Sequence, residues 1–330
     1  MLPLIFALLL GFIIIMYVIL DGFDLGIGIL FPFTESESDR DQMMNSVAPV
    51  WDGNETWLVF GGAMLYGAFP LVYGSLLPML YMPIMLMVLA LIFRGVCFEF
   101  RFKAVSAKAL WNWCFAISSI AASFFQGVIL GCFIQGFPAH ANKVQLNVHH
   151  WLTSFSVLTG VALVCGYALL GASWMLIKCE GRLHEKMQHA AKGLLILVGF
   201  FLVLVSIWTP LQSTVIFKRW YQWPHPLFFA PLPLITIFAS FLMWKQLGKI
   251  TASWQPFFYS IVIFLCAYAG IGVSVYPYLI PWQTTFWEAA APDSTLRFIL
   301  AGVIFALPVL LGYTAYAYYV FRGKTYDAYH

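Results

Sequence analysis

Two acidic side chains lie inside a segment that is otherwise strongly apolar. Asp21 and Asp24 are three residues apart in the stretch 3–31, so on a helix they share one face. A charged side chain at the centre of a membrane helix costs about 2.5–3.5 kcal/mol on insertion scales, so such residues mark a functional site by default. Two carboxylates this close cannot both ionise cheaply in a low dielectric. The pair predicts a proton relay or a cation site, and a structural pair that neighbouring helices satisfy explains the spacing equally well.

A second acidic motif opens the next apolar stretch. Asp52 and Glu55 lie three residues apart in the segment 46–57, with Trp51 and Asn54 beside them. Acids near a helix N-terminus are favoured by the helix dipole, which supplies a structural explanation. Trp51 is also suited to the membrane interface, where tryptophan is enriched. The motif therefore predicts either acids at the entrance to a buried site or acids that stabilise the start of a helix.

Two arginines, Arg94 and Arg101, lie at the end of the third apolar stretch. Cytoplasmic ends of membrane helices are enriched in Lys and Arg, and this enrichment accounts for both residues. A supporting role beside the acids is the second interpretation.

Gly22 and Gly26 form a G-x-x-x-G step beside Asp21 and Asp24. Small residues at this spacing let another helix backbone approach closely. We therefore expect a tightly packed polar contact at this point of the helix, and not a lipid-facing surface.

The composition shows which elements must position these residues. Hydrophobic residues make up 62% of the 330 and charged residues 9%, far below the roughly 25% of a soluble domain. Helices are the expected element, because backbone groups in lipid must be paired internally. We predict an all-α integral membrane protein, a single membrane-embedded domain over 1–330, with two four-helix bundles plus one extra helix. The nine expected spans are 3–31, 48–70, 75–97, 112–136, 150–177, 192–216, 225–245, 256–280 and 296–321.

The placement of the basic residues predicts the orientation. With the N-terminus outside, the cytoplasmic side receives 13 of the 17 Lys and Arg residues: Arg40, Arg94, Arg101, Lys103, Lys108, Lys178, Arg182, Lys186, Lys192, Lys245, Lys249, Arg322 and Lys324. The other side receives four: Lys143, Lys218, Arg219 and Arg297. Cytoplasmic loops carry the excess of basic residues, so we expect the N-terminus outside and the C-terminus in the cytoplasm.

Several kinds of site are not expected. The seven histidines lie in loops or at the ends of spans, whereas a membrane haem needs ligands that project from bundle helices: His140, His149, His150, His184, His189, His225 and His330. We therefore predict no haem ligand in this chain. The cysteines lack metal-like spacing, so no metal site is predicted, and the dispersed basic residues give no support to nucleic-acid binding.

The two acidic motifs together resemble subunit II of the cytochrome bd-type quinol oxidases. The resemblance rests on the runs 21–28 (DGFDLGIG) and 49–58 (PVWDGNETWL), in that order. Later motifs match in the same order and extend the resemblance over almost the whole chain: Ile92-Phe-Arg94, Phe98-Glu-Phe-Arg101, Tyr276-Pro-Tyr278 and Trp287-Glu-Ala-Ala290. The Trp51–Trp57 run is similar to the cyanide-insensitive branch of the family.

The resemblance implies a heterodimer in the inner membrane of a bacterium. Subunit I would carry the haems, two of type b and one of type d or b, and the quinol site. The complex would oxidise quinol, reduce O₂ to water and build a proton gradient. A small accessory membrane subunit and a structural quinone belong to the same expectation, without residues that can be assigned to them here.

The resemblance also implies roles for the acids. Asp52 would be the entrance of a path for cytoplasmic protons, with Asp21 and Asp24 deeper in the membrane. Trp51 and Asn54 would shape the passage. Without the resemblance, acids beside glycines would suit an ion-coupled secondary transporter at least as well. A purely structural scaffold is the third alternative.

Overall fold

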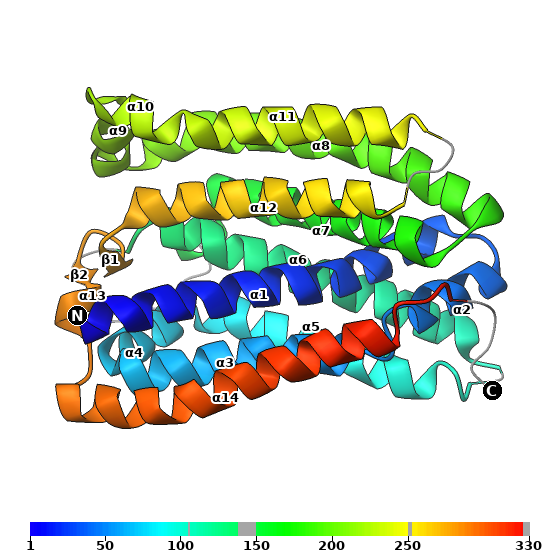
Figure 1. Cartoon of the computed structure of the whole chain (residues 1–330), viewed down its shortest axis with the longest axis horizontal. Helices are drawn as coiled ribbons and strands as arrows, with labels where there is room; N and C mark the ends of the chain where they lie inside the picture. The colour runs from blue at the N-terminus through cyan, green and yellow to red at the C-terminus, as the bar shows by residue number, and fades with distance from the viewer. Residues whose placement is uncertain (105, 138–149, 250–252, 326–330) are drawn as a thin grey trace.

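A computed structural model describes residues 1–104, 106–137, 150–249 and 253–325 as one bundle of long helices. The N-terminus lies at one end of the bundle and the end of the last helix at the other (Figure 1). The long helices are α1 (Leu2–Leu30), α3 (Trp51–Ala68), α5 (Tyr81–Phe100), α6 (Lys108–Gln135), α7 (Ser154–Lys178), α8 (Gly181–Gln212), α11 (Pro231–Leu247), α12 (Trp254–Val275) and α14 (Asp293–Val320). The short elements are η1 (Phe31–Phe33), α2 (Glu37–Asn45), α4 (Pro70–Met79), α9 (Thr214–Tyr221), α10 (His225–Phe229), α13 (Phe286–Ala289), β1 (Tyr278–Ile280) and β2 (Thr284–Thr285).

Eight helices in the described part of the chain are long and apolar enough to cross a membrane. They comprise α1, α5, α6, α7, α8, α10 together with α11, α12 and α14. The helix α3 lies within the span expected at 48–70 but is not among the eight, because Asp52, Asn54 and Glu55 make its first turns polar. The expected all-α membrane fold is confirmed, and the expected count of nine spans is not.

Several expected boundaries are wrong by more than a turn. The third span was expected to begin at residue 75, but the chain breaks at Leu80 and α5 begins at Tyr81. Pro83 in the first turn of α5 explains the break, because proline cannot donate the backbone hydrogen bond that would continue α4. The helix α8 begins at Gly181, so the expected loop 178–191 is mostly helical. The expected loop 32–47 contains α2, whose N-cap Ser36 accepts a hydrogen bond from the backbone of Asp39.

The helices form two groups, with α1 at the centre of the molecule. In one group α7 packs against α8 and α12, and α11 packs against both of these. In the other, α1 packs against α3 and α6, and α5 packs against α6. Contacts of α7 with α1 and α6 join the groups, and α14 lies against α3. This packing agrees with the expected two four-helix groups and one extra helix.

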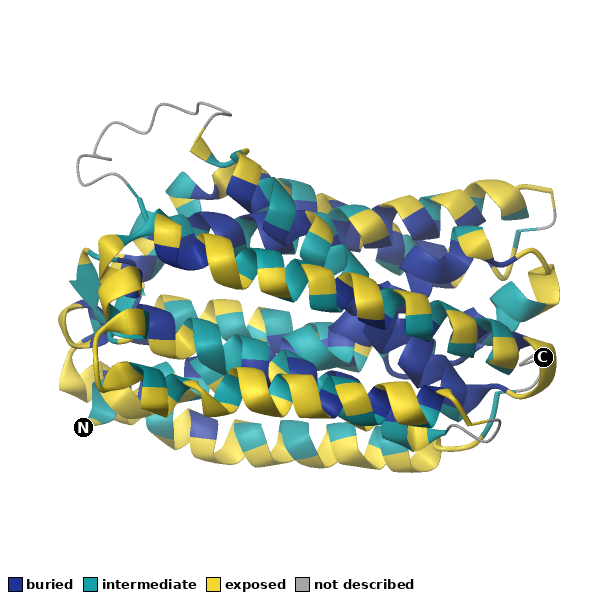
Figure 2. Ribbon diagram, turned by 90° about the horizontal axis from the view of Figure 1, so that it is seen from above, coloured by how far each residue is buried: buried dark blue, intermediate teal, exposed yellow. Residues whose placement is uncertain are grey.

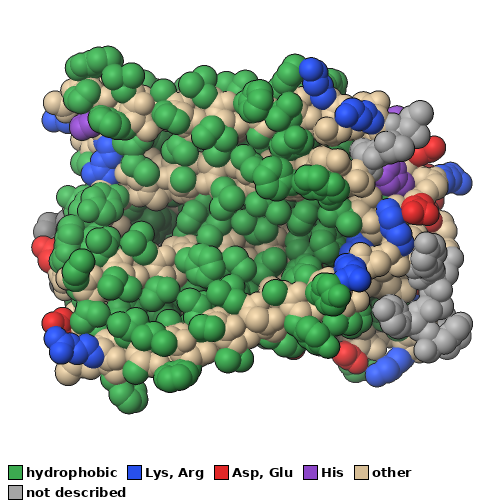
Figure 3. Space-filling model, viewed as in Figure 1, with side chains coloured by type: hydrophobic (Ala, Val, Ile, Leu, Met, Phe, Trp, Pro, Cys, Tyr) green, Lys and Arg blue, Asp and Glu red, His purple; other side chains and the backbone are tan. Residues whose placement is uncertain are grey.

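The outer surface of the bundle is apolar around its middle. Exposed residues face outward on the peripheral helices and buried residues gather in the interior (Figure 2). The face shown in Figure 3 carries a band of hydrophobic side chains, with charged residues gathered toward the two ends. Large apolar side chains on α14 illustrate the band, since Phe298 is 82% exposed and Phe305 is 76% exposed. Hydrocarbon, and not water, is the solvent that suits this surface.

A small hairpin closes the end of the bundle where α12 stops. The strands β1 and β2 pair antiparallel, and α13 follows them directly. Thr285 caps α13 in a capping box with Glu288. Hydrogen bonds from the backbone and hydroxyl of Thr285 lower the pKa of the exposed Glu288 carboxyl, so Glu288 is a capping residue in this fold.

Candidate functional site

Asp21 and Asp24 both lie in the interior of the bundle with no exposed surface. They share a face of α1 but have different partners. Asp21 Oδ1 accepts a hydrogen bond from Arg94 at 2.5 Å, whereas Asp24 Oδ2 accepts one from Asn54 at 2.7 Å. The second oxygen of each carboxyl makes no hydrogen bond with the described residues. The two acids therefore belong to two separate branches of one buried polar cluster.

The guanidinium of Arg94 connects three helices. It donates from Nη1 to Asp21 on α1 and from Nη2 to Glu55 on α3, the second at 2.9 Å. Arg94 has no exposed surface, and the Glu55 side chain is 25% exposed. Arg94 therefore lies inside α5 and is paired with two acids, and its contribution to topology stays a prediction. A buried cation of this kind requires paired acids, because an unpaired charge in a low dielectric is strongly unfavourable.

Asn54 links the second branch to the last helix. Its amide nitrogen donates to Asp24 and to the backbone carbonyl of Leu20, the second at 3.3 Å. Its amide oxygen accepts a hydrogen bond from the Tyr318 hydroxyl at 2.9 Å. Asn54 is 1% exposed, so this amide is enclosed by α1, α3 and α14.

A third polar contact lies one turn before Asp21. Gln126 on α6 donates to the Tyr17 hydroxyl at 2.6 Å and accepts from the Tyr167 hydroxyl at 2.8 Å. Tyr17 precedes Asp21 by four residues on α1 and so lies on the same face of the helix. One amide thus ties α6 to both α1 and α7 beside the buried acid.

Close packing holds α1 in this position. A Cβ atom at Gly26 would lie 1.9 Å from the backbone oxygen of Tyr167, and one at Gly171 would lie 2.5 Å from the backbone of Gly26. A Cβ at Gly22 would meet the ring of Tyr167 at 2.7 Å. The expected close approach at the G-x-x-x-G step is confirmed, and only glycine permits the distance between α1 and α7.

An open groove leads from the side of the bundle to Glu55. It has a volume of about 330 Å³ and lies between α3 and α5. Its lining residues are Trp51, Asp52, Glu55, Thr56, Val59, Leu91, Ile92 and Gly95. Asp52 is exposed in the first turn of α3, and Trp51 stacks on Phe98 with ring centroids 4.7 Å apart. Glu55 therefore faces the groove on one side and Arg94 on the other.

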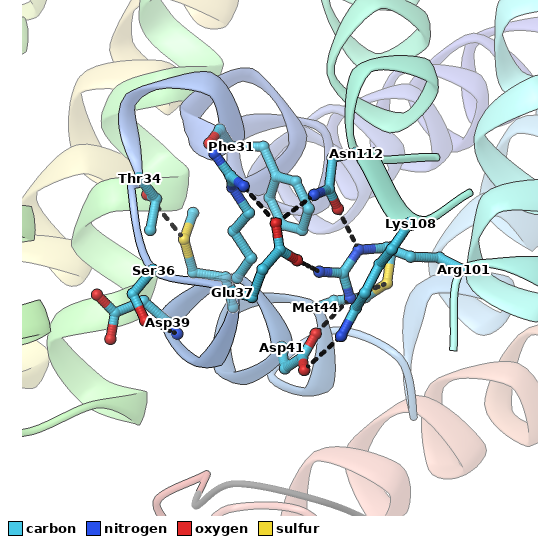
Figure 4. A network of polar contacts seen from close by, with 12 residues as sticks. Phe31, Thr34, Ser36, Glu37, Asp39, Asp41, Met44, Arg101, Lys108 and Asn112 are labelled. Atoms are coloured by element: carbon cyan, nitrogen blue, oxygen red, sulfur yellow. Dashed lines mark hydrogen bonds and ion pairs between the residues drawn. The ribbon is translucent and has the colours of Figure 1, made fainter. Parts of the chain in front are cut away.

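Arg101 belongs to a different cluster, at the end of the bundle where α2 lies (Figure 4). It has no exposed surface and donates to Asp41 at 2.6 Å, to Glu37 at 3.2 Å and to Asn112 at 2.5 Å. Lys108 also pairs with Asp41, at 2.9 Å. Arg101 is the C-cap of α5 and its contacts fasten α2 onto α5 and α6, whereas its contribution to topology stays a prediction.

Sequence reasoning missed three polar residues of the site. Gln126, Tyr167 and Tyr318 each stand inside an apolar stretch that was expected to span the membrane. A buried polar side chain in such a stretch usually has a polar partner, so these residues carried a signal. Their partners lie on other helices, and the partner of Tyr318 is 264 positions away in the chain.

The His, Cys, Asp and Glu residues that could bind a metal are dispersed in the described part of the chain. No group of three or more His, Cys, Asp or Glu residues that could hold a metal ion occurs among them. His184 and His189 lie in the first turns of α8, and His225 begins α10. His150 is exposed just before α7. The remaining histidines, His140, His149 and His330, lie outside the described residues.

Comparison with known proteins gives concordant matches. The family model described as cytochrome bd terminal oxidase subunit II matches residues 2–321. Cytochrome bd-I ubiquinol oxidase subunit 2 of Escherichia coli is 27% identical, over 96% of this chain and 93% of the relative. Cytochrome bd ubiquinol oxidase subunit 2 of Bacillus subtilis is 27% identical, over 92% and 91%. A chain of the bd oxidase structure from Geobacillus thermodenitrificans has the same fold, with a TM-score of 0.78, 18% identity and coverage of 97% and 98%.

Proposed function

Because the chain belongs to the cytochrome bd terminal oxidase subunit II family, we propose that it is the haem-free subunit of a quinol oxidase and supplies cytoplasmic protons to the partner's oxygen site. Subunit I would hold the b-type haems and a d- or b-type haem and would carry out the reduction of O₂ to water. The alternative of an ion-coupled transporter loses its basis, because the family assignment accounts for the same acids.

The observation that carries the proposal is the excess of buried acid around one cation. Asp21 and Glu55 pair with Arg94, Asp24 lies one turn further along α1, and both aspartates are fully buried. If all three carboxyls ionised, the cluster would hold two more negative charges than positive ones. In a low dielectric such an excess favours a neutral carboxyl, so the cluster is suited to holding and releasing a proton.

The groove supports an entrance from the side of α3. Asp52 lies in the first turn of α3, at the end of the bundle where α14 also ends (Figure 1). The excess of basic residues favours a cytoplasmic position for that end. A proton taken up at Asp52 would pass to Glu55 in the same groove and then to Asp21 beside Arg94. Asp24 and Asn54 form the neighbouring branch.

The same groove supports a docking place for subunit I. Asp52 and Thr56 are exposed on the flank of the bundle, and although the Thr56 hydroxyl donates to the Asp52 carbonyl at 3.0 Å, the Asp52 carboxylate would be unfavourable in contact with lipid. A protein partner that covers the α3 and α5 face would enclose this groove.

Copurification and crosslinking test this proposal. A tagged chain should bring down a larger membrane protein that carries all the haem of the complex. A cysteine in place of Thr56 should crosslink to that partner, whereas a cysteine in place of Ile196, which is 62% exposed on α8, should not. Haem that stays at one per chain in the isolated subunit, or crosslinking from Ile196 alone, would contradict the proposal.

A further inference from the structure

A short segment after α14 is fastened to two other helices. We call residues 321–325 the C-terminal strap. The side chain of Lys178, at the end of α7, donates to the strap carbonyls of Phe321 and, at 3.2 Å, Gly323. In return the backbone N–H of Thr325 donates to the Lys178 carbonyl at 2.9 Å, and the side chain of Gln42 on α2 donates to the Thr325 carbonyl.

The Lys178 ammonium is held in place from a second side. Lys178 is 3% exposed, and its Nζ lies 5.0 Å from the centroid of the Trp174 ring. A desolvated cation over a tryptophan face is attracted by the ring quadrupole. Since its hydrogen-bond acceptors are strap carbonyls, the burial of this charge depends on the strap being in position.

The strap adds to the contacts that hold α14, in which partly buried residues such as Ile299 and Leu307 pack against the core. Only Leu296 and Val303 are buried on this helix, and its outer face is exposed along most of its length. Near the strap, the ring of Tyr318 packs edge-on against Phe23 and Trp174, at centroid distances of 6.3 and 5.9 Å. The position of Tyr318 is therefore set by this aromatic contact and by the strap that begins three residues later.

The three hydrogen bonds of the Asn54 side chain fix which of its atoms is the nitrogen, and with it the direction of the Tyr318 hydrogen bond. The carbonyl of Leu20 can only accept, so the Asn54 atom that faces it must be the amide nitrogen. That nitrogen also donates to Asp24 at 2.7 Å. The amide oxygen of Asn54 is then left to accept from the Tyr318 hydroxyl at 2.9 Å.

We propose that Tyr318 is a positioning residue for Asp24, acting through Asn54, and that the C-terminal strap keeps Tyr318 in place. This inference rests on the proposed role of the buried acids in proton delivery. The terminal side-chain torsion of an asparagine can take a broad range of angles. Without the Tyr318 hydroxyl, Asn54 loses one of the hydrogen bonds that restrain this torsion. Asp24 would then lose the alignment of its hydrogen bond while its other oxygen stays without a partner.

The test compares two tyrosines of α14 in the assembled oxidase. Tyr318→Phe keeps the ring in its aromatic contact and removes only the hydroxyl. Tyr316→Phe is the matched control, because Tyr316 is 68% exposed on the same helix. The infrared band of Asp24 is identified as the carboxyl or carboxylate band that disappears in Asp24→Asn, and oxygen consumption is measured on the same preparations.

We expect Tyr318→Phe to shift the Asp24 band and to slow turnover by up to about tenfold, which corresponds to about 1.4 kcal/mol. Tyr316→Phe should do neither. An unshifted band and wild-type turnover in Tyr318→Phe, alongside slow turnover in Asp24→Asn, would overturn the inference and leave the proposed function standing. Wild-type proton uptake in Asp24→Asn would remove Asp24 from the proposed relay, and the band shift would still decide whether Tyr318 positions it.

The strap is tested by a double-variant cycle. Lys178→Met removes both side-chain hydrogen bonds to the strap and keeps the length of the side chain. It should shift the Asp24 band in the same direction as Tyr318→Phe, by a smaller amount. The two changes should not be additive, because both act through the same contact. Additive effects, or an unshifted band in Lys178→Met, would exclude the strap from the mechanism.

Discussion

Glu55→Gln is the most informative single change, because Glu55 alone among the three acids around Arg94 faces the groove. Glutamine preserves the shape of the side chain and its oxygen still accepts from Arg94, which lies 2.9 Å away. The Arg94 charge keeps its shorter bond of 2.5 Å to Asp21. Replacing the ion pair by a hydrogen bond from the guanidinium to a neutral amide oxygen costs about 1 kcal/mol, because Asp21 still pairs with Arg94, so the complex should still assemble.

The loss of a proton carrier should be much larger than this loss of stability. A positioned acid or base contributes typically about 10²–10⁴-fold to a rate, and internal water would reduce the loss toward the lower value. The assay is oxygen consumption with excess quinol, together with proton uptake from the cytoplasmic side of reconstituted vesicles. The haem spectrum of the complex serves as the measure of assembly and should not change.

Glu99→Gln is the matched control for Glu55→Gln. Glu99 is also a glutamate of this region, but its side chain is 69% exposed and its ion pair with Lys103 is long, at 3.6 Å. Exposed pairs of this kind contribute about 0–1 kcal/mol, so turnover should remain normal. Wild-type oxygen consumption and proton uptake in the assembled Glu55→Gln enzyme would refute the reasoning, because Glu55 both lines the groove and pairs with Arg94.

Three further predictions concern the entrance, the packing and the topology. Asp52→Asn should slow turnover and proton uptake while the haem spectrum stays intact, since the amide cannot carry a proton; undiminished proton uptake would remove Asp52 from the path. Gly26→Leu should lower the amount of assembled complex on a gel of solubilised membranes, because overpacking costs about 1–3 kcal/mol or more, whereas Gly62→Leu, where an added Cβ meets nothing within 4 Å, should assemble normally. A cysteine at Ser38 should resist a membrane-impermeant reagent applied from outside and one at Asn142 should react; the opposite pattern would invert the topology.

The membrane class and most helices follow from the sequence because they depend on local properties. A stretch of about 20 apolar residues can satisfy its backbone in lipid only as a helix, whatever its neighbours are. The importance of Asp21 and Asp24 is local in the same sense, since the cost of a carboxyl in an apolar stretch does not depend on its partner. Boundaries were less predictable, as the early start of α8 at Gly181 shows, because polar helical turns extend beyond the apolar stretch.

The contacts of the site depend on which helices are neighbours, and only the tertiary structure decides that. Arg94 on α5 and Arg101 at its C-cap are seven residues apart and have similar sequence surroundings, yet Arg94 pairs with Asp21 and Arg101 with Asp41. Each buried guanidinium takes its partner from another helix, 73 and 60 positions away in the chain. The sequence by itself determined that buried charge had to be paired in this protein. The packing of α1, α3 and α5 decided the pairing around Arg94, because hydrogen bonds form between groups that are close in space, and closeness across a bundle is not a local property of the chain.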